Sequence, residues 1–232
     1  MAGLMEAAFA TDRHTMMKEA NGVPGDLARS MAAPLSDWIA QGPRTHVLKA
    51  VDPHTDELLG WVCWRRSDET KMPPRPAATG GDGAPQVVPA LSQGTDAPHS
   101  TVDELEHLTD SDRERWQREI MPPGTACWYI VAIAVAPRAQ SRGIGAALIS
   151  WGTTRADAEG LFCWVHGSEA GRRAFEKAGF TEDDHLTVDL DTYAAAPPGS
   201  ETGLQRWGEY TFTYMRREPA STLHRNREAE SG

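Results

Sequence analysis

An apolar run at residues 128–136 is followed by a glycine-containing turn at residues 140–145. The run is too short to cross a membrane and is rich in β-forming residues, so it predicts a buried strand. Pro137 ends this strand, because proline has no N–H to give to the ladder of hydrogen bonds. After the turn, a helical pattern places one apolar face on Ile144, Ala147, Leu148 and Trp151.

The rest of the apolar pattern predicts further helices and strands. Helices are expected at residues 2–10, 24–40 and 168–177. Pro34 would bend or split the second of them, and Gly179 would end the third in a left-handed conformation. Strands are expected at residues 45–51, 58–65, 161–165, 181–190 and 210–216, the first two as a hairpin. In the hairpin Trp61 and Trp64 alternate, so one could face the core and the other a cleft, but packing is the favoured role for large aromatics here.

Composition changes sharply at residues 67–100, which are rich in proline, glycine and polar residues. Such a segment cannot bury enough apolar area to offset its ordering entropy, so it predicts a flexible insertion. Capping boxes at residues 101–104 and 111–114 predict two short helices, or one helix broken at Asp110, within residues 101–120. We expect one domain over residues 1–217, followed by a disordered tail at residues 218–232.

The formal net charge of the chain is −10 at pH 7, which argues against a nucleic-acid partner. An acidic surface suits a cationic substrate such as a polyamine or a basic peptide, or serves solubility alone. Cys63, Cys127 and Cys163 lie in predicted strands without metal-ligand spacing, which predicts reduced, buried thiols and no metal site. No signal peptide or membrane-length apolar run is found, so we expect a cytoplasmic protein with no membrane partner.

The strand, the turn and the following helix together predict an anion-binding site. Successive backbone N–H groups point into such a turn, and the helix dipole adds about half a positive charge. Gly143 and Gly145 let the backbone approach the anion without a Cβ in the way. The alternative is a strand–turn–helix connection that binds no ligand.

Spacing separates the known turns of this outline. A P-loop needs a lysine after Gly145, and none follows. A dinucleotide-binding turn needs a third glycine where this chain has Leu148. The pattern [QR]xxGx[GA] after V-x-P is met by Val135-Ala136-Pro137 and the turn from Gln140 to Gly145. This segment resembles the GNAT superfamily of acyl-CoA-dependent N-acetyltransferases, whose turn holds the pyrophosphate of coenzyme A.

The resemblance continues downstream of the turn. Residues 174–180, AFEKAGF, are similar to the superfamily's closing motif A-x-Y-E-K-x-G-F. Residues 168–171, SEAG, are similar to the S-P-A-G of a fungal-type subgroup. The resemblance implies an α/β fold with a mixed, mostly antiparallel sheet, splayed central strands and flanking helices. The superfamily begins with a strand before its first helix, whereas this chain begins within or just before that helix, so the sheet edge is expected to differ.

The resemblance also implies acetyl-CoA as cosubstrate. Its pantetheine arm would pair with the backbone of Ile133, Ala134 and Val135. Its pyrophosphate would lie on the turn, formed by Gln140, Ser141, Arg142, Gly143, Ile144, Gly145 and Ala146. The side chains of Arg138 and Arg142 would lie near the pyrophosphate, or else be ordinary surface cations. Ser168 and Phe175 would lie beside the cofactor.

The groups that handle protons are open on the sequence. Many relatives carry a tyrosine acid where this chain has Phe175, which has no proton to give. His166 is the candidate base, because histidine titrates near neutral pH, with an exposed loop histidine as the alternative. Ser168 is a second catalytic candidate, with a simple helix N-cap as the alternative. Cys163 and His166 would point to opposite faces of a strand, so a cysteine nucleophile is not expected.

The predicted function is transfer of an acetyl group from acetyl-CoA to a primary amine by direct attack in a ternary complex. A small-molecule acceptor is expected, because no added recognition domain is predicted. The alternatives are a protein or peptide N-acetyltransferase, and a non-catalytic acyl-CoA-binding regulatory protein. The sequence identifies neither the acceptor nor the oligomeric state.

Overall fold

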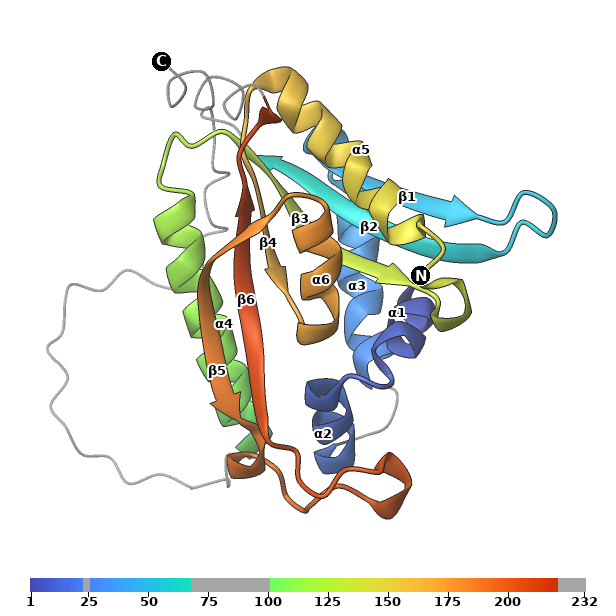
Figure 1. The fold of residues 1–232 in the computed structure, drawn as a ribbon, viewed down its shortest axis with the longest axis vertical. Helices are drawn as coiled ribbons and strands as arrows, with labels where there is room; N and C mark the ends of the chain where they lie inside the picture. The colour runs from blue at the N-terminus through green and yellow to red at the C-terminus, as the bar shows by residue number, and fades with distance from the viewer. Residues whose placement is uncertain (23–25, 68–100, 221–232) are drawn as a thin grey trace, which may run out of the picture.

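A computed structural model describes residues 1–22, 26–67 and 101–220, and its centre is a six-stranded sheet (Figure 1). The strands, in the order β1-β2-β3-β4-β6-β5, are β1 (Thr45–Val51), β2 (Leu58–Ser67), β3 (Cys127–Val135), β4 (Cys163–Gly167), β6 (Glu209–Arg217) and β5 (Thr181–Asp189). Neighbouring strands are antiparallel except β3 and β4, which are parallel. The predicted fold class, a mixed and mostly antiparallel α/β sheet, is confirmed. Most of the predicted insertion (residues 67–100) and of the predicted tail (residues 218–232) lies outside the described residues, namely residues 68–100 and 221–232, whereas Ser67 is the last residue of β2.

Helices cover both faces of this sheet. They are α1 (Ala2–Phe9), α2 (Arg13–Asn21), α3 (Asp26–Ala40), α4 (Thr101–Ile120), α5 (Ile144–Glu159) and α6 (Glu169–Lys177). Trp61 packs with α1 and α3, whereas Trp64 packs with α5 on the opposite face. Trp164 packs with α4, whereas Val165 packs with α5 and α6. The sheet therefore has an α5 face, with α5 and α6, and an α4 face, with α1, α3 and α4. Both tryptophans of the hairpin are buried in the core, so neither faces a cleft.

Helix α5 is fixed on the sheet by one tryptophan and one glycine. The ring of Trp64 lies directly against Gly152, where an added Cβ would overlap it. The indole N–H of Trp64 donates to the carbonyl of Leu148 at 3.1 Å. The buried face of α5 runs through Leu148, Ile149, Gly152, Thr153 and Ala156. Of the predicted face, Leu148 is buried and Ile144 and Trp151 pack against the core, whereas Ala147 is exposed.

Strand β3 is bulged and then leaves its parallel neighbour. Cys63 pairs with Ala132 and Trp64 pairs with Ile130, so Val131 is an extra residue opposite β2. The pairing of β3 with β4 ends where Ile130 meets Val165. Beyond that point β3 pairs only with β2, and the splayed central strands that the sequence predicts are present. The backbone of β3 that faces β4 is thus open to a ligand.

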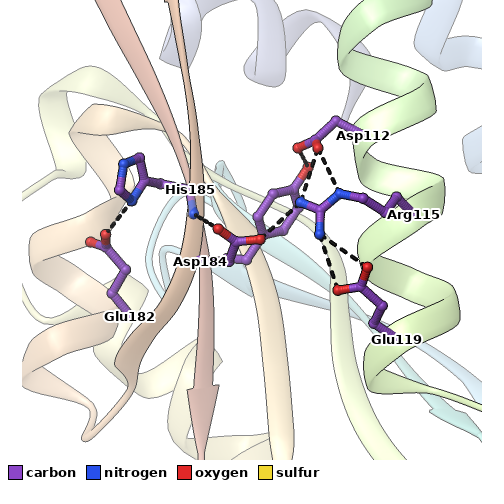
Figure 2. A network of polar contacts seen from close by, with 7 residues as sticks. Asp112, Arg115, Glu119, Glu182, Asp184 and His185 are labelled. Carbon is purple, nitrogen blue, oxygen red and sulfur yellow. Dashed lines mark hydrogen bonds and ion pairs between the residues drawn. The ribbon is translucent and has the colours of Figure 1, made fainter.

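Helix α4 is continuous, so the predicted break at Asp110 is wrong. Polar side chains in its middle bond within the helix instead of ending it: Thr109 donates to the carbonyl of Glu106 at 3.1 Å, and Arg113 pairs with Asp110 at 2.7 Å. Figure 2 shows how α4 is held against the sheet. Arg115 contacts Asp112 and Glu119 of α4 and Asp184 of β5.

Two early helices differ from what the sequence predicts. Helix α2 was not predicted, because its sequence RHTMMKEAN is mostly polar, and only the cap at Asp12, which accepts from the N–H of Thr15 at 3.1 Å, marks its start. Helix α3 continues through Pro34, although Pro34 was expected to bend or split it.

The C-terminal segment after β6 is held at Ala220, whose N–H donates to Asp157 at 2.8 Å.

Candidate functional site

The turn between β3 and α5 has the geometry of an anion-binding loop. Ser141 and Gly143 adopt left-handed conformations, with φ of 60° and 83°. Gly143 is the N-cap of α5 and supplies no side-chain cap, so the first N–H groups of this helix are available to a ligand. A Cβ on Gly143 would meet nothing within 4 Å, which leaves open space beside the backbone. Backbone turns of this kind arrange successive N–H groups around one anion.

A cleft of about 1180 Å³ joins this turn to the splayed strands. It contains most of the residues that the sequence assigned to the cofactor, namely Ile133, Ala134, Val135, Gln140, Ser141, Gly143, Gly145, Ala146, Ser168 and Phe175. Gln140 also braces the turn, because its side-chain amide donates to the carbonyl of Val135 at 3.2 Å. We call this cavity the main cleft. It places the open backbone of β3 and the open helix N-terminus along one path.

Arg138, Arg142 and Ile144 do not line the main cleft. Arg138 forms an ion pair with Glu57 in the β1–β2 loop. Asp52 in the same loop accepts hydrogen bonds from the backbone N–H groups of His54 and Thr55, which lower the pKa of its carboxyl group. The exposed Arg142 adds a smaller effect in the same direction. Ile144 packs with the small apolar cluster at the base of the turn. Of the two arginines that the sequence placed near the pyrophosphate, neither lines the main cleft, whereas Arg173 of α6 does.

Ser168 and Phe175 lie on the α6 side of the main cleft. Ser168 is the N-cap of α6 and accepts from the N–H of Gly171 at 3.3 Å, as its helix-cap alternative predicts. Gly179 has φ of 87° beyond the end of α6, which confirms the predicted left-handed stop. Phe175 is 3% exposed and packs edge-to-face on Phe180, with ring centroids 5.8 Å apart. Its place in the cleft is apolar.

His166 lies inside β4 and not in a loop after it. Its ring stacks on Phe212 and Tyr214 of β6, with centroid distances of 5.4 and 4.8 Å. Burial, and after it the charge of Arg113, lowers the pKa of His166 from 6.5 to about 4. The side chain is therefore a neutral imidazole at neutral pH, able to accept a proton but only weakly basic. The alternative of a solvent-exposed loop histidine is wrong.

His14 of α2 is a site residue that the sequence analysis missed. Its ring packs edge-to-face with Phe212, with centroids 5.1 Å apart, and also contacts Tyr210 at 5.5 Å. Its Nε2 is buried and has no hydrogen-bond partner within the described part of the chain. Burial, and then Lys18, lowers its pKa to about 4. Only recognition of the Asp12 cap could have placed this histidine on a helix.

A second cavity of about 320 Å³ opens beside the main cleft at these histidines. We call it the small chamber, and its lining comprises His14, Lys18, Glu106, Thr109, Asp110, Arg113, His166 and Phe212. The two cavities share His14, Lys18, Glu106, His166 and Phe212. Helix α4 supplies four residues of the lining. The helix that follows the insertion therefore forms a wall of the site.

The cysteines take no part in this site. Burial raises the pKa of Cys63 to about 11 and those of Cys127 and Cys163 to about 12. Cys163 belongs to the cluster on the α5 face, whereas His166 faces β6 residues on the α4 face, so the two cannot act as a pair. Over residues 1–22, 26–67 and 101–220, no group of His, Cys, Asp or Glu side chains could hold a metal ion. Nor is any helix in these ranges long and apolar enough to cross a membrane.

A bulged central strand, its departure from a parallel neighbour and a turn that opens a helix define the GNAT fold. Residues 109–180 match the model of the acetyltransferase (GNAT) family. The matched segment runs from the middle of α4 to Phe180, and over it the chain is similar to that family. The resemblance that the turn and the closing motif predicted is confirmed at this level.

Several solved structures are similar to this chain at low sequence identity. A putative arylalkylamine N-acetyltransferase 7 from the yellow fever mosquito is 18% identical with a TM-score of 0.53, covering 94% of this chain and 81% of that one. A protein described as histone acetyltransferase HPA2 and related acetyltransferase, from Corynebacterium glutamicum, is 16% identical with a TM-score of 0.49, covering 95% and 90%. A phosphinothricin acetyltransferase from Sinorhizobium meliloti, in complex with AcCoA, is 13% identical with a TM-score of 0.43, covering 94% and 85%. No curated protein matches the sequence.

Proposed function

We propose that this protein transfers an acetyl group from acetyl-CoA to the primary amine of a small molecule, by direct attack in a ternary complex. The observation that carries the proposal is the continuity of the main cleft. It runs from the anion-binding turn, along the open backbone of β3, to His166. A thioester and an amine bound in this cleft would meet without leaving the protein.

The residues present fit acetyl-CoA. The turn offers uncapped helix N–H groups and open space at Gly143, which suit a pyrophosphate. The β3 residues beyond Ile130 have no partner in β4, so their backbone can pair with a pantetheine arm as an added strand would. When bound, acetyl-CoA supplies the acetyl thioester that the amine attacks.

The chain's own groups account for the remaining steps. In this proposal, a backbone N–H of β3 near the bulge donates to the developing oxyanion. His166, a neutral imidazole at the junction of the two cavities, accepts the proton of the amine directly or through water. The new bond joins the amine nitrogen to the carbonyl carbon, and the bond to sulfur breaks. Since a thiol has a pKa of roughly 8.5, the thiolate can leave without an acid at Phe175.

Ser168 has a narrower role in this proposal. Its hydroxyl caps α6 and lines the main cleft, so it supports the cofactor side of the site. The similarity of residues 168–171 to a fungal-type subgroup has no support from the comparisons, and the proposal names the GNAT family alone. A cytoplasmic location belongs to the proposal too, supported by three buried cysteines that carry free thiols.

A protein acceptor is the alternative of the same reaction type. One similar structure is named for an arylalkylamine acceptor and another for a histone, so these names do not decide between a small-molecule and a protein acceptor. We favour a small molecule because the amine side of the site is a chamber of about 320 Å³, closed on one side by α4. An extended peptide would need an open groove there.

Two measurements test the proposed function. Isothermal titration calorimetry with acetyl-CoA measures cofactor binding, and release of free thiol with a panel of amines measures transfer. We expect both binding and amine-dependent thiol release. Binding without transfer to any amine would instead identify a non-catalytic acyl-CoA-binding protein. A folded protein that does not bind acetyl-CoA at millimolar concentration would contradict the proposal entirely.

A further inference from the structure

The lining of the small chamber includes two ion pairs, one between α2 and α4 and one within α4. Lys18 of α2 pairs with Glu106 of α4, and Arg113 pairs with Asp110, both on α4, at 2.7 Å. All four side chains line the chamber, together with the imidazoles of His14 and His166 and the ring of Phe212. The chamber is therefore lined by two cations, two anions and two neutral bases. Its formal charge is zero.

The ion pairs are open to exchange with a ligand. The four side chains are between 31% and 64% exposed, so solvent weakens both pairs and each contributes little to stability. A ligand that brings a carboxylate and an ammonium group can replace both partners without leaving a charge uncompensated. A diamine would bring two positive charges next to Lys18 and Arg113. A dicarboxylate would bring two negative charges next to Glu106 and Asp110.

We propose that the acceptor is a small amine that also carries a carboxylate, of the free amino-acid type. Arg113 and Lys18 bind the carboxylate, Glu106 and Asp110 hold the ammonium group, and His166 receives its proton. Phe212 and the ring of His14 contact the apolar part of the molecule. This inference rests on the proposed function, because it names the acceptor of that same site.

The position of Arg113 adds a second reason for a carboxylate. The charges that act on His166 come from Arg113, Asp112 and Asp110 of α4 and from His14 of α2, and Arg113 has the largest effect. A carboxylate bound to Arg113 would offset that charge and so raise the pKa of His166 toward its ordinary value. An acceptor with a carboxylate thereby makes its own base stronger. An acceptor without one leaves His166 weakly basic.

Matched pairs of ligands test the proposal directly. Each pair is an amino acid and the amine that remains when its carboxylate is removed: phenylalanine and phenethylamine, tryptophan and tryptamine, histidine and histamine, lysine and cadaverine. Affinity is measured by calorimetry on the full chain saturated with CoA, so that no turnover is needed. We expect at least one amino acid to bind about tenfold or more tightly than its amine, since a charge-assisted contact contributes about 1.5–3 kcal/mol. Equal or tighter binding of the amine in every pair, or no binding by any member, would overturn the proposal.

A pair of variants on one helix separates recognition from folding. Arg113→Gln should weaken binding of the preferred amino acid about 10- to 100-fold and change binding of its amine less than about threefold. Arg118→Gln is the control, because Arg118 is 71% exposed on α4, pairs only loosely with Glu114 at 3.7 Å and lines neither cavity. If Arg113→Gln weakens both ligands of a pair equally, the carboxylate contact is wrong.

The same experiment distinguishes this inference from the proposed function. Amino-acid binding without acetyl transfer would leave the ligand class standing and contradict the enzymatic proposal. Transfer to amines that lack a carboxylate, with no preference for amino acids, would do the reverse. Transfer only to peptides would replace the proposed acceptor class by a protein substrate.

Discussion

The turn at residues 140–146 offers backbone groups to its ligand, whereas the small chamber offers side chains from α2, α4, β4 and β6. The turn is one contiguous segment, and its glycine spacing is visible in the sequence. The chamber assembles residues that are far apart in the chain, from His14 to Phe212. Backbone recognition tolerates changes of side chain at most positions. Side-chain recognition changes with each substitution, so the two ends of the site can vary independently.

The largest effect is expected where the backbone site is blocked. Gly143→Glu places bulk and negative charge in the turn, and should weaken acetyl-CoA binding about 100- to 1000-fold, measured by calorimetry. Gly124→Glu is the matched control, because Gly124 also has a positive φ (93°) with nothing near its Cβ position, but lies in the loop before β3. Unchanged affinity in a folded Gly143→Glu variant would refute the cofactor site.

The next effect concerns the side-chain end of the site. His166→Phe keeps an aromatic ring between Phe212 and Tyr214 but removes the proton acceptor. We expect kcat to fall about 100-fold with acetyl-CoA affinity unchanged. His185→Phe, an exposed histidine on β5 paired with Glu182, should leave kcat as it is. A similar loss in both variants would show that the effect is not specific to the chamber.

The two half-buried histidines of the chamber also predict how stability depends on pH. The pKa values of His14 and His166 are lowered to about 4 in the folded protein, whereas unfolded histidines titrate near 6.5. Between these values the unfolded state binds more protons, so stability is complete above about pH 6.5 and falls as the pH drops toward 4. From pH 7 to 5 each histidine should cost about 2 kcal/mol, measured by urea unfolding. Replacing both histidines by phenylalanine should flatten this dependence, and an unchanged slope would contradict it.

The cofactor turn could be predicted from the sequence, whereas the small chamber could not, and the difference has a physical reason. Gly143, Gly145 and the V-x-P strand end are local signals, because backbone geometry is fixed by neighbouring residues. Four of the residues in the chamber lining belong to α4, and their meaning depends on where the fold brings that helix. His166 was identified from its position after apolar residues, but its burial depends on Tyr214 and Phe212 from a distant strand. His14 was missed together with its mostly polar helix.

The packing of α5 on the cofactor side of the fold depends on the close contact between Gly152 and Trp64. Gly152→Ala would push a Cβ into the ring of Trp64, and should destabilise the protein by about 1–3 kcal/mol in chemical unfolding. Gly3→Ala is the matched control within a helix, because its Cβ would meet nothing within 4 Å. That change should instead stabilise the protein by about 0.5–1 kcal/mol. Destabilisation by both changes to the same extent would exclude the tryptophan contact as the cause.

The smallest effect is expected in the network of Figure 2. Arg115→Met removes the bonds to Asp112, Glu119 and Asp184, and because the side chain is 37% exposed, about 1 kcal/mol or less of stability should be lost. Hydrogen exchange should increase in α4 and at the β5 contact, but not in α5. Arg118→Met provides the comparison on the same helix. Faster exchange throughout the protein would mean that Arg115 supports the whole fold and not the position of α4.

The extra residue at Val131 changes which residues of β3 share a side of the sheet. Before Val131, Trp128 and Ile130 pack on the α5 face, and after it Ile133 and Val135 do so. The residues of β3 that face α5 therefore change from even-numbered to odd-numbered within one strand. A sequence comparison that assumed a single two-residue period would assign half of this strand to the wrong side. It would also place Ala132 and Ala134, which lie on the side of α1 and α3, among the residues that support α5. The parity change at Val131 therefore marks the point from which β3 must be aligned separately in any distant relative.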